Sequence, residues 1–352
     1  MMAQRPTIED LQHINKGVRA SFHRILYEYG PGNGTILSLP FDQLVEHGPG
    51  HEFKWERSAK PEAVIELANR GPFSAMVLSV GQAQKYHPEI EIPLIVKLDG
   101  HFYTGKANDD NYPIHTNFGS VQEAAEIGAD AVGLTFYLAS TQTGQDVERI
   151  GKIRKAAHDA GMPLVLWVYP RGPVPNETQI NSMLWAHYAV SAGESIGADI
   201  VKTKFPDVVS AARREAYESF IRDEYTGKIS EATRYLEYEP DISALHEYDA
   251  SLAKGEKPDY NSLLSEEEHI ERVGIVTGAG TRTFVIYSGG PRIEGDAKSA
   301  LEKTTRIIME AGAEGRIIGR NFWGVPIEQS LELAETVCTV MQSDEYTRPQ
   351  GG

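Results

Sequence analysis

The sequence has one cysteine, few basic residues and no long apolar run. Its 352 residues include 34 Lys and Arg against 50 Asp and Glu, a net charge of −16. Such a surface repels nucleic acids and anionic membranes, so we expect neither as a partner. Cys338 has no second cysteine to pair with, which excludes an internal disulfide and favours a reducing compartment. Because neither a secretory leader nor a membrane-length segment is visible, we predict a cytoplasmic protein.

Signatures of cofactor and metal binding are also lacking. The glycine-rich segments 30–34 and 278–280 do not follow a strand in the pattern of a dinucleotide site, and they are typical of turns. His47 and His51 are four residues apart, but the Gly-Pro-Gly between them forbids the helix that would bring both imidazoles to one face. The sequence therefore predicts no cofactor and no metal.

What the sequence does contain is an alternation of short apolar runs with longer amphipathic stretches. Eight predicted strands lie at Thr35–Phe41, Ala75–Val80, Pro93–Leu98, Ala131–Tyr137, Pro163–Tyr169, Asp199–Lys204, Thr283–Ser288 and Gly315–Ile318. This alternation predicts an α/β fold, a (β/α)8 TIM barrel formed by residues 1–352 as a single domain. Residues 1–33 form an N-terminal extension. Residues 205–273 form an insertion after strand 6, for which a substrate lid, an oligomer contact and an extended crossover remain open.

Two lysines two residues apart, Lys202 and Lys204, end the sixth predicted strand. Because side chains alternate along a strand, both amines face the same way, into the barrel. A desolvated lysine near another cation loses proton affinity and can attack a carbonyl as a neutral amine, forming a Schiff base. An edge strand with solvated lysines is the alternative reading of this pair alone.

Other polar residues follow the predicted strands at the end where the active sites of such barrels lie. Trp167 and Tyr169 share a face, and this tyrosine can exchange protons with substrate if nearby cations lower its pKa. The loops after strands 7 and 8 contain Ser288, Gly289 and Gly290, and then Gly319 and Arg320, which are suited to holding a phosphate. The remaining polar residues at these strand ends are Asp42, Lys97, Asp99 and Arg171.

Taken together, these segments resemble the archaeal-type class I fructose-1,6-bisphosphate aldolases, a group also found in bacteria. The resemblance rests on the segments Leu39–Gln43, Val45–Pro49, Pro93–Leu98, Trp167–Gly172, Ala198–Lys202, Ser288–Pro291 and Gly319–Asn321. Gln43 stands where shorter archaeal members commonly have histidine, and the long insertion is similar to bacterial members.

The resemblance implies a metal-independent lyase of glycolysis and gluconeogenesis that cleaves fructose 1,6-bisphosphate, a sugar phosphate, into dihydroxyacetone phosphate and glyceraldehyde 3-phosphate. By the same resemblance, Lys202 forms the Schiff base, Tyr169 shuttles protons and Asp42 contacts substrate hydroxyls. Trp167 would form a wall of the pocket, and Arg171 would bind substrate. For Lys204 the ground is strand alternation, not the resemblance: it lies near Lys202 and would lower the pKa of that lysine or contact phosphate. A homo-oligomer, as large as a decamer, is also implied. Two alternatives remain: a sister enzyme of the heptulosonate synthase or phospho-sugar thiolase type, and a non-catalytic phosphate-binding barrel.

Overall fold

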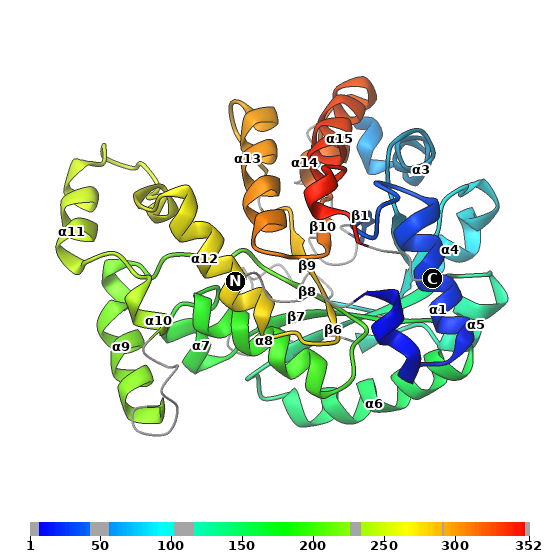
Figure 1. Ribbon diagram of the computed structural model, residues 1–352, viewed down its shortest axis with the longest axis horizontal. Helices are drawn as coiled ribbons and strands as arrows, with labels where there is room; N and C mark the ends of the chain where they lie inside the picture. The colour runs from blue at the N-terminus through cyan, green and yellow to red at the C-terminus, as the bar shows by residue number, and fades with distance from the viewer. Residues whose placement is uncertain (1–6, 43–55, 102–115, 226–233, 291, 349–352) are drawn as a thin grey trace.

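Eight parallel strands close into a barrel in the computed structural model, which describes residues 7–42, 56–101, 116–225, 234–290 and 292–348 (Figure 1). The strands pair in the order β1-β10-β9-β8-β7-β6-β3-β2. Their bounds are β1 Ile36–Phe41, β2 Ala75–Ser79, β3 Leu94–Lys97, β6 Ala131–Leu138, β7 Leu164–Pro170, β8 Ile200–Thr203, β9 Phe284–Ser288 and β10 Gly315–Ile317. All eight predicted strands are present, and the (β/α)8 prediction is confirmed. The sequence analysis missed a two-stranded hairpin, β4 Asp99–Gly100 with β5 Thr116–Asn117.

Helices between the strands surround the barrel. They are α3 Pro61–Arg70, α4 Val80–Tyr86, α5 Val121–Glu126, α6 Thr143–Asp159, α8 Met183–Ser195, α12 Glu266–Gly278, α13 Ala297–Glu310 and α15 Ile327–Met341. Side chains alternate along each strand, so that Val165 and Ile200 fill the barrel interior while Leu166 and Val201 pack in the layer beneath the helices. No helix in the described ranges is long and apolar enough to cross a membrane.

The N-terminal extension closes one end of the barrel. Helix α1 (Lys16–His23) and the following turn η2 (Arg24–Glu28) place Val18, Phe22 and Ile25 in the same buried cluster as the interior side chains of the strands. The Phe22 ring lies 5.0 Å from the ring of Phe284 on β9. Helix α1 and η2 therefore close the barrel at the N-terminal ends of its strands.

Three acidic residues join neighbouring strands at this sealed end. The carboxylate of Asp130 accepts a hydrogen bond from the first N–H of β3, Asp199 accepts one from the first N–H of β7, and Glu314 accepts one from Val285 of β9. The glycine two residues before each acid has a φ of 75°, 88° or 83°, which suits glycine at a helix end. The sequence Gly-Ala-Asp or Gly-Ala-Glu therefore recurs before three strands for a structural reason, because it fixes each new strand against the previous one.

Most helices of residues 205–273 lie away from the ring of helices that surrounds the barrel. Helices α9 (Ala211–Tyr225), α10 (Arg234–Glu237) and α11 (Ile242–Ser251) lie at the left edge of Figure 1, away from α1. Helix α12 runs past residue 273 to Gly278 and packs on both α8 and α13, so the last part of the predicted insertion is the crossover helix into β9.

Candidate active site

A cavity of about 1000 Å³ opens at the C-terminal ends of the strands. Its lining includes most of the predicted site residues: Asp42, Tyr169, Arg171, Lys202, Lys204, Ser288, Gly289, Gly290, Gly319 and Arg320. Trp167 lies one step deeper on β7, in the barrel interior. The sequence prediction therefore brought together residues that do share one site, although they come from strands far apart in the chain.

Lys202 and Tyr169 form the centre of the cavity. The Nζ atom of Lys202 lies 2.6 Å from the Tyr169 hydroxyl oxygen, within hydrogen-bond distance. Burial lowers the pKa of Lys202 to about 8, and Arg320 acts in the same direction while Asp42 opposes it. The lysine thus holds a substantial neutral fraction near neutral pH, as a carbonyl nucleophile requires.

Burial has the opposite effect on Tyr169, because the phenol is neutral when protonated. It raises the pKa of Tyr169 well above the usual range, although Lys97, Arg171 and Arg320 lower it. The neighbouring cations do act in the direction that the sequence analysis required, but burial outweighs them in the free site. Tyr169 rests as a protonated hydroxyl that can donate to a group formed at Lys202.

The Trp167 ring lies close to two amines of the site. Its ring centroid is 5.7 Å from Nζ of Lys202 and 5.6 Å from Nζ of Lys97, distances at which a cation interacts with an aromatic face. A side chain at Gly133 on neighbouring β6 would come within 2.4 Å of the Trp167 ring, so a glycine is needed there. The ring is therefore an apolar neighbour of both amines at the inner end of the site.

Lys97 is a site residue to which the sequence analysis gave no role. It is only 1% exposed, and its Nζ donates to the Asp42 carboxylate over 3.0 Å. This ion pair joins the end of β3 to the residue that follows β1, and it fixes the carboxylate near Lys202. The available signal was the alternation in β3, which places Lys97 on the same inward face as Ile95.

Lys204 and Arg171 lie beside the ring of Tyr169. The Lys204 Nζ is 5.6 Å from its centroid, and the Arg171 guanidinium carbon is 5.5 Å from it. These positive groups give the mouth of the cavity a local charge opposite to that of the whole chain. An anionic substrate is thereby attracted to the strand ends.

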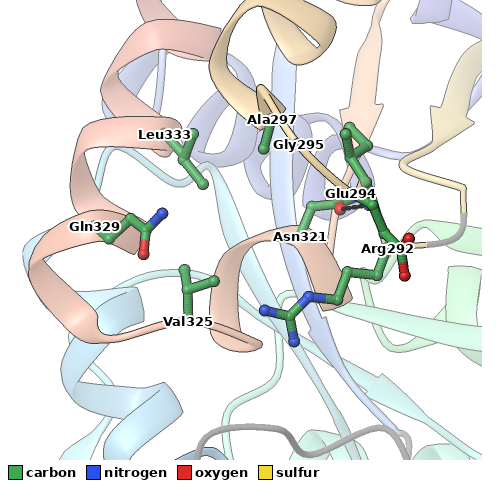
Figure 2. Close-up of a pocket in the computed structure, with 9 residues that line it drawn as sticks. Arg292, Glu294, Gly295, Ala297, Asn321, Val325, Gln329 and Leu333 are labelled. Atoms are coloured by element: carbon green, nitrogen blue, oxygen red, sulfur yellow. Dashed lines mark hydrogen bonds between the residues drawn. The ribbon is translucent and has the colours of Figure 1, made fainter.

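The loops after β9 and β10 are joined by the residues of the short helix α14 (Arg320–Trp323). Arg320 donates to the Gly290 carbonyl over 3.1 Å, and the Asn321 amide donates to the Gly289 carbonyl over 3.0 Å. Behind these loops is a second cavity of about 290 Å³ between α13 and α15 (Figure 2), and Arg292 lines both cavities. The two glycine loops therefore form one unit at the edge of the main cavity.

Several residues singled out in the sequence lie outside the described part of the chain. They are Gln43, the segment Val45–Pro49 with His47, and also His51 and Pro291. Among the residues that are described, no group of three or more His, Cys, Asp or Glu side chains is arranged to hold a metal ion.

The fold and the site together define a (β/α)8 barrel with a buried lysine of lowered pKa among its strand ends. A family model described as "DeoC/LacD family aldolase" matches residues 36–324, and the chain belongs to this family. It is 35% identical over 175 residues to a protein of Thermoproteus tenax named fructose-bisphosphate aldolase class 1, covering 49% of this chain and 63% of that protein.

Two further relatives cover more of the chain. A protein of Chlamydia trachomatis named probable fructose-bisphosphate aldolase class 1 is 27% identical over 317 residues, 87% of this chain and 79% of that protein. The solved structure of a fructose-bisphosphate aldolase from Slackia heliotrinireducens superimposes with a TM-score of 0.70 at 18% identity, covering 97% of this chain and 92% of the other. This structural likeness concerns the fold. The matches to the first curated relatives span less than two thirds of those proteins, at 63% and 66% of their lengths.

Proposed function

We propose that the protein is a class I, metal-independent aldolase that cleaves fructose 1,6-bisphosphate to dihydroxyacetone phosphate and glyceraldehyde 3-phosphate and catalyses the reverse condensation. The observation that carries this proposal is the Lys202–Tyr169 pair, 2.6 Å apart in the cavity, with burial lowering the pKa of the lysine to about 8. The names of the Thermoproteus and Chlamydia relatives support the choice of substrate.

In the proposed mechanism, neutral Lys202 attacks the C2 ketone and forms a carbinolamine. Tyr169 donates its proton to the departing hydroxyl group, so that water leaves and a protonated imine remains beside the phenolate. This cation stabilises the phenolate, which explains how a tyrosine with a raised pKa can give up its proton here.

Carbon–carbon cleavage then uses the same two groups. The Tyr169 phenolate takes the proton of the C4 hydroxyl, the C3–C4 bond breaks, and its electrons move into the iminium to leave an enamine and glyceraldehyde 3-phosphate. Tyr169 next donates that proton to C3, and hydrolysis of the resulting imine releases dihydroxyacetone phosphate and frees Lys202. Every proton that leaves the tyrosine is thus returned to it over the cycle.

The remaining residues bind and orient the substrate in this proposal. Asp42, held by Lys97, accepts hydrogen bonds from substrate hydroxyls, and Trp167 supports the imine from below. The C1 phosphate lies against the backbone of Ser288, Gly289, Gly290 and Gly319, with Arg320 adding a charge-assisted contact. Arg171 and Lys204 contribute positive charge at the cavity mouth.

The proposal is tested by reduction with borohydride in the presence of dihydroxyacetone phosphate and excess chelator, followed by mass mapping. The expected adduct is on Lys202, and Lys202→Met abolishes it while Lys204→Met retains it. An adduct on Lys204 would reassign the nucleophile. A protein that binds the ketone without forming an adduct would refute the Schiff-base mechanism.

We further propose, from the family resemblance, that the enzyme works in the cytoplasm as a homo-oligomer of barrels. Light scattering of the purified protein measures the number of chains. A monomer at the concentration of the activity assay would refute the oligomer.

A further inference from the structure

The main cavity also reaches a space beneath helix α13, outside the ring of strands. We call this space the α13 pocket. It is defined by residues that line the main cavity on this helix and on the strand below it: Ala300, Lys303, Thr304 and Ile307 of α13 and Arg316 of β10.

Arg316 and Lys202 lie on opposite faces of the strands. Arg316 is level with Tyr287 of β9, which packs in the layer between the strands and the helices. Lys202 is level with Trp167 of β7, which lies in the barrel interior. Because side chains that are level on neighbouring strands share a face of the sheet, Arg316 points toward α13 and Lys202 points into the barrel.

Arg316 carries a buried positive charge that no described carboxylate neutralises. The residue is 3% exposed, and its Nη1 donates to the Thr305 hydroxyl over 2.7 Å, the Thr304 hydroxyl over 3.0 Å and the Leu301 carbonyl over 3.3 Å. All three acceptors are uncharged. Burial lowers the pKa of Arg316 to about 10, and no acid in the described ranges opposes this shift, so the guanidinium is a cation at neutral pH. A buried cation without a counter-charge is unfavourable, and a bound anion would offset that cost.

The second terminal nitrogen of Arg316, Nη2, is the donor that such an anion can reach. It makes no hydrogen bond with a residue that the structure describes, and unlike Nε it is not enclosed by protein where Arg316 lines the cavity. The other charges of the pocket nearly cancel, since Lys303 and Asp259 act on the pKa of His269 in opposite directions. The charge of Arg316 is therefore the one that stays unbalanced.

The proposed substrate does not provide this anion. In the proposed reaction its C2 carbon is bonded to Lys202 inside the ring of strands, and its C1 phosphate lies against the loops after β9 and β10. Arg171 and Lys204 give the cavity mouth the positive charge for its other phosphate. Neither phosphate requires Arg316, which lies on the outer face of β10.

We infer that the α13 pocket is a second anion site, in which Nη2 of Arg316 donates to the oxyanion group, a phosphate or a carboxylate, of a small molecule other than the substrate. The inference goes beyond the proposed function, because the site needs no nucleophile and no imine. It also explains why a strand next to the catalytic loops buries an arginine without an acid.

The test measures urea unfolding of the full chain in inorganic phosphate or in acetate, at constant ionic strength. Excess hexitol 1,6-bisphosphate, the reduced and unreactive form of the proposed substrate, keeps the substrate phosphate positions filled. At ten times the dissociation constant of phosphate, the remaining site should lower the unfolding equilibrium constant by about tenfold. The same gain with acetate would extend the ligand class from phosphates to carboxylates.

Arg316→Leu should lose this gain. The variant is expected to fold, because the Thr304 and Thr305 hydroxyls keep donating to the carbonyls of Ala300 and Leu301. Arg306→Leu is the matched control, since it removes an arginine of the same helix whose side chain is 41% exposed and paired with acids, and it should keep the full gain.

The outcomes separate this inference from the proposed function. An equal gain in wild type and folded Arg316→Leu, or no gain in wild type with either anion, overturns the inference and leaves the aldolase proposal standing. If the hexitol does not bind, the proposed substrate is wrong, while a gain lost only in Arg316→Leu still supports the anion site. If Arg316→Leu does not fold, wild-type crystals grown in selenate decide: an anomalous peak beside Nη2 supports the inference, and its absence overturns it.

Discussion

The lowered pKa of Lys202 makes Schiff-base formation depend on pH in a defined way. With a pKa of about 8 instead of the ordinary 10.5, the neutral fraction at pH 7 is roughly 10% instead of about 0.03%, an increase of about 300-fold. The rate of adduct formation should therefore rise with pH and level off just above pH 8. Trapping of dihydroxyacetone by cyanoborohydride between pH 6 and 10 measures this profile, and this ketone has no phosphate whose binding could change.

Two charge substitutions should move the midpoint of that profile in opposite directions. Arg320→Met removes a cation that disfavours the charged amine, so the pKa of Lys202 should rise, whereas Asp42→Asn removes an anion and should lower it. Each shift should be up to about one pH unit. Arg282→Met, an exposed position at the sealed end of the barrel, serves as the control and should not move the midpoint. Shifts of the same sign, or a wild-type rate still rising at pH 10, would refute the reasoning.

Three further substitutions test the energetics and the mechanism. Lys202→Met should abolish adduct formation and stabilise the fold by about 3 kcal/mol at pH 7, because a lysine whose pKa is lowered from 10.5 to about 8 destabilises the folded state. Since the unfolded chain binds more protons between those values, that gain should shrink as pH rises from 8 to 10.5, which urea unfolding at several pH values measures; a constant gain would contradict it. Tyr169→Phe should slow both imine trapping and turnover, turnover by about 10² to 10⁴, because this hydroxyl gives its proton to the departing water and later to C3; turnover that is unchanged in the folded variant would argue against a proton-transfer role. Arg272→Met should cost about 3 kcal/mol in unfolding free energy, the lower end for a broken buried ion pair, because Glu239 loses this partner and keeps Arg214; a cost below about 1 kcal/mol would show that this ion pair does not anchor α12.

Local sequence patterns were sufficient for the barrel and for the residues that share the site. Strand alternation correctly placed Trp167 and Tyr169 on one face and brought Lys202 to the same cavity. The β4–β5 hairpin was missed because each strand has only two residues, too few for a periodic pattern.

Features that depend on contacts between distant segments could not be predicted in this way. The Lys97–Asp42 ion pair joins residues 55 positions apart, and no sequence pattern predicts that these two residues meet. The direction of the Tyr169 pKa shift depends on how completely packing removes water, which outweighs the cations visible in the sequence.

The packing of helix α1 against the closed end of the barrel also bears on the order of folding. Helix α1 leaves the ribosome before any strand, yet the ring against which Phe22 packs belongs to β9, more than 250 residues later. The apolar face of α1 must therefore wait, exposed or held by other partners, until nearly the whole barrel has been synthesised. Contacts between such distant segments slow folding. Until they form, chaperones or a second chain can bind the exposed apolar face of α1.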